Sequence, residues 1–188
     1  MRKLIVSEFI SLDGVIQAPG GVDEDTDGGF TRGAWTLPYW HDDIGAQFGR
    51  LMADADAVLL GRRTYVSHAQ AFEPNPAEDP FAGMAKYVVS KTLETSLWAN
   101  TTILRDDPID AIRALKAGPG KDILTDGSSQ LVQALFAADL VDELHLLVYP
   151  VILGGGKRPF PNGVDAKLAV KEVKQYGSGV VGLHYTRA

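Results

Sequence analysis

The sequence predicts an α/β fold with a mostly parallel central sheet, helices on both faces of that sheet and an antiparallel C-terminal hairpin. From the N-terminus to about residue 150, short apolar runs alternate with segments of helical periodicity, as in parallel strands joined by helices. After the glycine run Gly154–Gly156, two strand-like segments flank a short turn, which indicates a hairpin. The length of 188 residues favours one domain, residues 1–188, with a core that needs no disulfide or metal.

The first third of the chain contains two predicted strands and two predicted helices. Each strand is a short apolar run bounded by turn-forming or polar residues. In the first helix, apolar residues recur three or four positions apart, and we expect Asp42 or Asp43 to cap its N-terminus. In chain order the expected elements are strand Lys3–Ile10, helix Asp43–Ala55, strand Ala57–Leu60 and helix Arg63–Ala71.

Two long loops interrupt this pattern. Ala18–Pro38 is rich in glycine and acidic residues, and a loop of that length is either functional or disordered. Because it carries Phe30 and Trp35, aromatic residues that a disordered linker usually lacks, we expect a functional loop. Glu73–Gly83, with three prolines and three acidic residues, is expected to be a loop with no side chain to bury.

The rest of the chain continues the alternation and then leaves it. A helix should begin at Asp107-Pro108, with a capping residue followed by proline at the first helical position. A further helix should follow the polar turn after the strand Ile123–Thr125, because apolar residues recur there at helical spacing up to Phe136. The other expected strands are Lys86–Ser90, Thr101–Leu104, Leu144–Val148, Leu168–Gln175 and Gly179–Tyr185.

The stretch Leu59–Tyr65, LLGRRTY, is a candidate anion site. It reads as a strand that ends at Gly61 and passes into a helix, whose first backbone N–H groups have no intrahelical partner and favour a negative charge. Gly61 would let a ligand approach the backbone, and Arg62 and Arg63 would add positive charge. A phosphate cradle and an ordinary strand-to-helix turn both remain open on this stretch alone.

Composition excludes several other classes of protein. The formal charge of −6, with basic residues scattered along the chain, argues against a nucleic-acid surface. Polar residues interrupt the first apolar run too early for a signal peptide or a membrane span, so we expect a soluble cytoplasmic protein. His68 and His184 show no metal-ligand spacing, and His145 is expected to be structural, so no metal site is predicted.

Five motifs resemble the dihydrofolate reductase superfamily, and the last two are most similar to its branch with the reductase domain of bacterial riboflavin biosynthesis, the RibD C-terminal domain. They occur in the family's order and span nearly the whole chain: SLDGVIQ at Ser11–Gln17, LLGRRTY at Leu59–Tyr65, VVSKTL at Val88–Leu93, TDGSSQLVQAL at Thr125–Leu135 and LVDELHLLVYPVILGGGKRPF at Leu140–Phe160. The resemblance implies a three-layer dihydrofolate-reductase-like fold.

The resemblance also implies an NADPH site. In the family, the segment at the second helix start contacts the cofactor phosphates, the end of the third strand meets the adenosine 2′-phosphate, and a glycine turn lies under the pyrophosphate. A first loop covers the nicotinamide. The matching residues are Gly61, Arg62, Arg63 and Thr64 at the helix start, Ser90, Lys91 and Thr92 at the strand end, Asp126, Gly127, Ser128, Ser129, Gln130 and Leu131 at the turn, and Asp13 and Gly14 at the loop.

One of these positions departs from the family pattern. The family usually has two adjacent glycines at the turn, where this chain has Asp126-Gly127. A carboxylate beside a pyrophosphate is unfavourable unless the side chain turns away to bond backbone N–H groups. Asp126 is therefore expected to oppose NADPH binding at this turn unless its side chain turns away.

Asp42 and Asp43 lie roughly where folate reductases carry the carboxylate that assists protonation, so a catalytic role and a capping role are both open for them. We expect an NADPH-dependent reductase that transfers a hydride to a C=N or C=O bond of a small pterin- or aminopyrimidine-like heterocycle. The alternatives are a riboflavin-pathway ribosylaminopyrimidine reductase, whose phosphate would need the basic residues Arg32, Lys157 and Arg158, and a non-catalytic nucleotide-binding or scaffold protein. The resemblance and the C-terminal edge hairpin also imply a homodimer.

Overall fold

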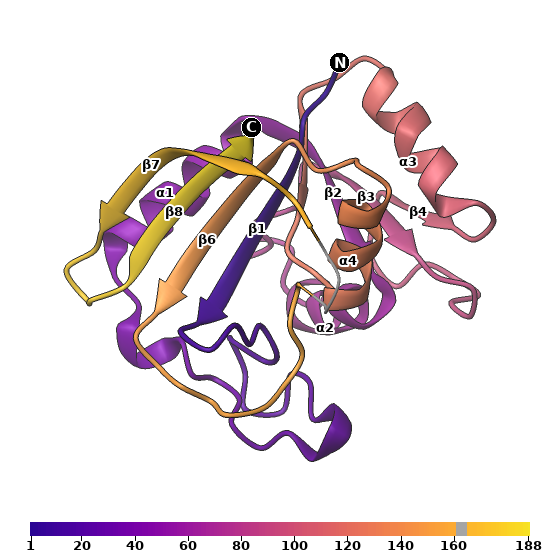
Figure 1. Ribbon diagram of the computed structural model, residues 1–188. Helices are drawn as coiled ribbons and strands as arrows, with labels where there is room; N and C mark the ends of the chain where they lie inside the picture. Colours follow the sequence, from indigo (N-terminus) through magenta and orange to yellow (C-terminus); the bar gives the residue numbers. More distant parts are fainter. Residues whose placement is uncertain (161–164) are drawn as a thin grey trace.

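The computed structural model describes residues 1–160 and 165–188, and these form an eight-stranded sheet with the strand order β4-β3-β2-β5-β1-β6-β8-β7 (Figure 1). The strands are β1 (Leu4–Ser11), β2 (Ala55–Gly61), β3 (Ala85–Val89), β4 (Thr101–Leu104), β5 (Asp122–Thr125), β6 (Glu143–Tyr149), β7 (Leu168–Gln175) and β8 (Val181–Arg187). The helices are α1 (Asp42–Ala53), α2 (Arg62–Phe72), α3 (Pro108–Ala117) and α4 (Ser129–Ala137), with short 3-10 helices η1 (Asp27–Gly29) and η2 (Leu37–Tyr39).

The direction of the strands confirms the predicted fold class. β1 to β6 pair in parallel, while β8 runs antiparallel to β6 and β7 runs antiparallel to β8. Parallel neighbours need crossover connections, and α1, α2, α3 and α4 lie in several of these crossovers. The change from crossovers to a hairpin after β6 is the change of pattern visible in the sequence.

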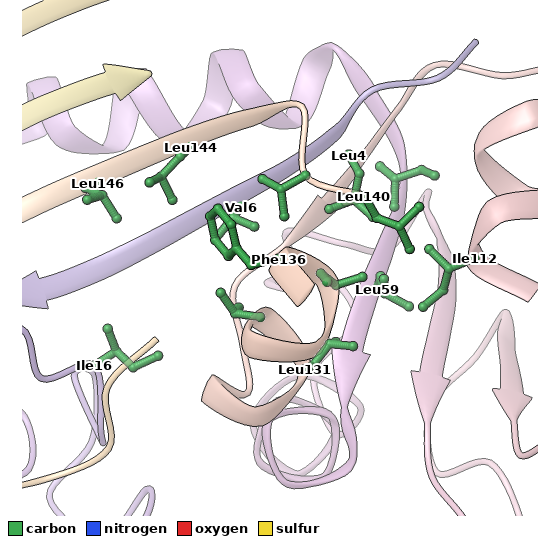
Figure 2. Close-up of a cluster of buried hydrophobic side chains, with 14 of the residues drawn as sticks. Leu4, Val6, Ile16, Leu59, Ile112, Leu131, Phe136, Leu140, Leu144 and Leu146 are labelled. Atoms are coloured by element: carbon green, nitrogen blue, oxygen red, sulfur yellow. The ribbon is translucent and has the colours of Figure 1, made fainter. Parts of the chain in front are cut away.

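Two apolar clusters hold the helices on opposite faces of the sheet. Leu131 and Phe136 of α4, with Ile112 of α3, pack against Leu4 and Leu59 from the strands on one face (Figure 2). On the other face, α1 and α2 pack over a cluster of buried residues from β1, β2, β3 and β5. Burial of a large aliphatic side chain stabilises a fold by roughly 1.5–3 kcal/mol, so these two clusters fix the three layers.

Several expected boundaries and caps are wrong in detail. The first helix ends at Ala53 instead of Ala55, because Ala55 already pairs with Asp122 as the first residue of β2. The cap of α1 is neither Asp42 nor Asp43: the ring of His41 accepts the hydrogen bond from the backbone N–H of Asp43.

The expectations for α3 and for the second loop need similar correction. α3 does begin with a proline, but the side chain of Asp107 makes no capping hydrogen bond. The loop Glu73–Gly83 does bury a side chain, because Phe81 is 3% exposed and packs with Trp98 in the cluster under α2.

The loop 18–38 is ordered around one aromatic side chain. Trp35 is buried, its indole N–H donates to the backbone oxygen of Gln17, and its ring meets Tyr149 edge-on with ring centroids 5.4 Å apart. The amide of Gln17 in turn donates to the backbone oxygens of Asp25 and Asp27. The aromatic residues therefore serve to fold this loop onto the ends of β1 and β6, where Figure 1 shows it.

The C-terminal hairpin forms the edge of the sheet. β7 is the last strand, and its side chains Val170 and Val173 are each 60% exposed. A homodimer through these strands stays a prediction, as does the cytoplasmic location. No helix in the described part of the chain has the length and apolar character needed to cross a bilayer.

Asp13 links the end of β1 to the segment after β6. Its carboxylate accepts hydrogen bonds from the backbone N–H groups of Leu153 and Gly154 and from the hydroxyl of Ser11. The Leu153 amide, with the other donors, lowers the pKa of Asp13 to about 2 from an ordinary value of 3.8. Because the folded-state pKa is depressed, this stabilisation is present above about pH 4 and is lost as the pH falls toward 2.

We therefore expect Asp13→Asn to lower the free energy of unfolding by about 1 kcal/mol near pH 7, a value that allows for partial solvent screening. The difference from wild type should shrink as the pH falls toward 3, as measured by urea unfolding. Asp23→Asn, at an exposed acid in the same loop region, is the matched control. A difference for Asp13→Asn that stays constant over this pH range would contradict the assignment.

Candidate active site

A cavity of about 1160 Å³ opens at the carboxyl ends of β1, β2, β3 and β5. This is the edge of a parallel sheet where ligands usually bind, because the loops after the strands converge there. Three of the four segments expected to bind the cofactor line this cavity. They are Gly61, Arg62, Arg63 and Thr64 after β2, Ser90, Lys91 and Thr92 after β3, and Asp126, Gly127, Ser128, Ser129, Gln130 and Leu131 after β5.

The other four expected residues do not line the cavity. Asp13 is occupied by the backbone amides after β6, and Gly14 lies beside the side chain of Arg158. Asp42 and Asp43 are exposed at the start of α1, outside the cavity wall. The structure therefore gives neither of these two carboxylates a contact with a ligand in the cavity.

Gly61 is needed for contact with the turn after β5. Its N–H donates to the backbone oxygen of Gly127 at 3.1 Å. A Cβ at position 61 would lie 2.9 Å from the Cβ of Ser128 and closer still to its hydroxyl oxygen. The glycine thus makes room for the neighbouring turn of the protein itself, where the sequence had suggested room for a ligand.

Two helices begin at this cavity without side-chain caps. The N-cap residues Gly61 of α2 and Ser128 of α4 make no side-chain hydrogen bond to the first turn of their helices. The first backbone N–H groups of both helices are consequently available to an anion, and both helix dipoles favour it. The side chains of Arg62 and Lys91 are exposed on the same cavity wall, and within the described ranges neither makes an ion pair.

The basic residues on the loop side are already paired. Arg63 contacts Asp27 at 2.5 Å and Asp25 at 3.7 Å, and Lys157 contacts the same two carboxylates at 3.1 Å and 2.5 Å. The hydrogen bond from Arg63, with that from Lys157, lowers the pKa of Asp27. These four charges fix the loop 18–38 beside the cavity.

Asp126 turns toward a histidine. Its Oδ2 lies 3.0 Å from Nε2 of His68, whose ring stacks on Phe81 with centroids 5.6 Å apart. Burial opposes a charge on His68, but attraction and the hydrogen bond to Asp126 outweigh it, so the pKa of His68 is raised. The partner of Asp126 is thus a side chain and not the backbone amides that the sequence suggested, and it offsets the charge next to the glycine turn.

Glu8 is a site residue that the sequence did not indicate. It is 5% exposed, lines the cavity and lies next to Gly127. Its Oε1 is buried without a hydrogen-bond partner in the described part of the structure, as is Oδ1 of Asp126. Burial, with repulsion from Asp126, raises the pKa of Glu8 well above its ordinary value. Burial thus favours the protonated form of Glu8, which can donate a hydrogen bond or a proton into the cavity.

The remaining wall of the cavity is apolar and aromatic. Phe9 follows Glu8 in β1 and points to the other face of the sheet, where Phe48 and Met52 of α1 line the cavity together with Trp40. Trp40 is 52% exposed. Such a wall suits a flat heterocyclic ring, because aromatic side chains either stack on the face of the ring or meet it edge-on.

The comparisons with known proteins agree with this geometry. The family model of the RibD C-terminal domain matches residues 2–182. The chain belongs to this family. The resemblance seen in the motifs is thereby confirmed.

One related protein and two solved structures each match almost the whole chain. The uncharacterized protein YyaP of Bacillus subtilis is 28% identical over 197 residues, covering 98% of this chain and 94% of that protein. A proposed riboflavin biosynthesis protein from Shewanella sp. PV-4 has a TM-score of 0.74 at 21% identity, covering 99% of both chains. Dihydrofolate reductase from Enterococcus faecalis, solved with NADP(H) and RAB-propyl, has a TM-score of 0.66 at 14% identity, covering 98% of this chain and 96% of that one. These two structures share the fold.

We expect Gly61→Ala to destabilise the protein by about 1–3 kcal/mol, because the new methyl group collides with Ser128. Gly83→Ala is the matched control, since a Cβ at Gly83 meets no atom within 4 Å. Removing the opposing side chain in the double variant Gly61→Ala/Ser128→Gly should restore part of the loss. Thermal unfolding of the three variants measures this, and equal stability of Gly61→Ala and Gly83→Ala would contradict the proposed contact.

Proposed function

We propose that this RibD C-terminal domain protein is an NADPH-dependent reductase that transfers a hydride to a C=N or C=O bond of a small pterin- or aminopyrimidine-like heterocycle. The observation that carries the proposal is that two helix N-termini without side-chain caps meet the aromatic wall at one cavity, together with Arg62 and Lys91, which make no ion pair in the part of the chain that the structure describes. The nucleotide part needs donors and positive charge, and the ring parts need apolar surface. The residues present therefore fit NADPH.

Each part of the cavity has a distinct role in this proposal. The first turns of α2 and α4, with Thr64 and Ser129, bind the pyrophosphate. Arg62 and Lys91 add positive charge, and Lys91 with Thr92 binds the 2′-phosphate. The aromatic wall around Phe48 would orient the heterocycle and exclude water from it. NADPH, when bound, supplies the hydride.

We further propose that Glu8 is the proton donor of this reaction. Hydride addition to a C=N or C=O bond leaves negative charge on the nitrogen or oxygen, and that atom must take up a proton. A buried carboxyl with a raised pKa holds its proton to a higher pH than an exposed carboxyl does, whereas Asp42 and Asp43 lie outside the cavity wall. The role in protonation that the resemblance suggested for Asp42 and Asp43 is thus assigned here to a residue on β1.

The charges of the cavity favour a substrate without a phosphate group. Arg32 does not line the cavity, Lys157 is paired with Asp25 and Asp27, and Arg158 lies 3.7 Å from Asp13. A ribosylaminopyrimidine phosphate would have to displace these carboxylates from their partners. The riboflavin-pathway reaction therefore remains the second candidate, supported by the family match and by the likeness to the Shewanella protein.

A non-catalytic binding protein is the alternative from another class. A buried acid without a hydrogen-bond partner is costly for a fold and is more often found at functional sites than in passive scaffolds. Glu8 and the Asp126–His68 pair therefore favour an enzyme. Tight NADPH binding without turnover on any pteridine or pyrimidinone would favour the scaffold.

We expect Arg62→Ala and Lys91→Ala each to weaken NADPH binding about tenfold, because each removes one charge-assisted contact to a phosphate. Lys91→Ala should weaken NADPH binding more than NADH binding, since only NADPH carries the 2′-phosphate. Lys167→Ala, at an exposed lysine that does not line the cavity, is the control. Calorimetry at fixed salt measures all four proteins, and a wild type that binds neither cofactor would end the reductase proposal.

We expect Glu8→Gln to retain NADPH affinity within about twofold but to lower turnover on a pteridine or pyrimidinone substrate about 100-fold or more. Glutamine keeps a hydrogen-bond donor but cannot transfer a proton. In the wild type, turnover should fall as the pH rises through the raised pKa of Glu8, and this limb should vanish in the variant.

A stability measurement tests the protonation of Glu8 without any substrate. The folded protein holds the proton of Glu8 to a higher pH than the unfolded chain does. Wild-type stability should consequently fall, relative to Glu8→Gln, as the pH rises above the ordinary glutamate pKa of 4.5. Parallel stability curves for the two proteins across this range would show that Glu8 is not a buried neutral acid.

A further inference from the structure

A second cluster of chemically active side chains lies away from the cofactor cavity, on the C-terminal half of the sheet. It consists of Glu143 and His145 of β6 and His184 of β8. Glu143 and His145 are two residues apart on one strand and so point to the same face. The antiparallel register places His184 directly opposite His145. The sheet therefore brings His184, which is distant in the sequence, to the neighbouring pair Glu143 and His145.

The three ligand atoms converge on one point. Nε2 of His145 lies 3.2 Å and Nε2 of His184 lies 3.0 Å from Oε2 of Glu143, and one ligand atom from each residue lies within 4.8 Å of the other two. Around a tetrahedral zinc ion with bonds of about 2.0–2.1 Å, neighbouring ligand atoms are roughly 3.3–3.4 Å apart. Small shifts of the side chains would thus admit an ion between them.

The two lysines next to the cluster do not contact the carboxylate oxygen of Glu143 that faces the histidines. Lys3 and Lys171 bind Glu143 through its other oxygen, Oε1, at 2.8 Å and 3.6 Å. Oε2 remains directed at the two imidazoles, and the Lys3 contact orients the carboxylate as an outer partner of a metal ligand does. The two ammonium groups also repel a cation, so they moderate the affinity.

A small cavity of about 30 Å³ adjoins the two histidines and has room for a fourth ligand. Ser7, Gln47 and Glu172 are among its lining residues, together with both histidines. This volume is sufficient for one water molecule, which polar partners can hold. Three protein ligands and one water make a complete tetrahedral shell.

We propose that Glu143, His145 and His184 form a binding site for a divalent transition metal, with zinc as the ion that best fits two imidazoles and one carboxylate. The metal joins β6 to β8 and so fastens the C-terminal hairpin to the parallel part of the sheet. The site lies outside the segments assigned to NADPH, and the proposal stands independently of the reductase activity.

Without a metal, the same atoms form a hydrogen-bonded cluster in which both imidazoles donate to Glu143. The metal-free and zinc-bound states differ in which ring nitrogen of each histidine carries the proton. A zinc-bound Nε2 has no hydrogen, so the proton of the neutral ring lies on Nδ1. The ring resonances of the histidines therefore distinguish them.

The experiment uses the full-length chain without an affinity tag, titrated with Zn²⁺ and with Co²⁺. The ring-proton NMR signals of His145 and His184 should shift at one equivalent of Zn²⁺, while those of His41 and His68 should not. Co²⁺ should give the intense visible absorption of a tetrahedral site. These readouts need only the wild type, so they do not depend on the folding of a variant.

Variants then test the individual ligands. His145→Gln and His184→Gln should each weaken zinc binding by about 100-fold or more, whereas His41→Gln, at an exposed histidine, should leave it unchanged. Saturating zinc should raise the thermal midpoint of the wild type and of His41→Gln only. No shift of the His145 and His184 signals, or equal zinc binding by all four proteins, would overturn the proposal.

Discussion

The contact between the end of β2 and the turn after β5 is the constraint on which the cavity depends. Because Gly61 has no side chain, Ser128 can lie against it and Gly127 can accept its hydrogen bond. These two chain segments carry the N-caps of α2 and α4, so the same contact points both helix starts at one space. A larger residue at position 61 would separate them, and neither helix alone would surround an anion.

The polar groups of the cavity divide into those that are paired within the protein and those that are free. Arg63, Lys157 and His68 are paired with carboxylates of the loop 18–38 or with Asp126. Oε1 of Glu8 has no hydrogen-bond partner among the described residues, and burial favours the neutral form of this carboxyl. Hydrogen-bonding capacity that a fold leaves unused in its interior is available to a ligand. The paired groups therefore fix the shape of the cavity, and the groups without a partner among the described residues are available to bind a ligand or transfer a proton to it.

Much of the fold could be predicted from the sequence because it depends on local patterns. Apolar runs and helical stripes predicted the strands and helices, and the glycine and arginines after β2 marked one segment that lines the cavity. The resemblance to the family indicated the other two segments, after β3 and after β5. Glu8 could not be found in this way, since it lies inside an apolar strand and its importance follows from burial under Gly127. The cluster of His145 and His184 depends on the register of β6 and β8, which no local spacing reveals.

The paired acids of the loop 18–38 have a consequence for how binding responds to ionic strength. Asp25 and Asp27 already neutralise Arg63 and Lys157, as a bound phosphate would. Any phosphate that reaches these cations would replace a carboxylate counterion of the protein and would release few ions from solution. The affinity for a phosphorylated ligand should accordingly fall less steeply with added salt than a count of the basic residues around the cavity suggests. Asp25 and Asp27 thus serve as counterions that belong to the protein itself.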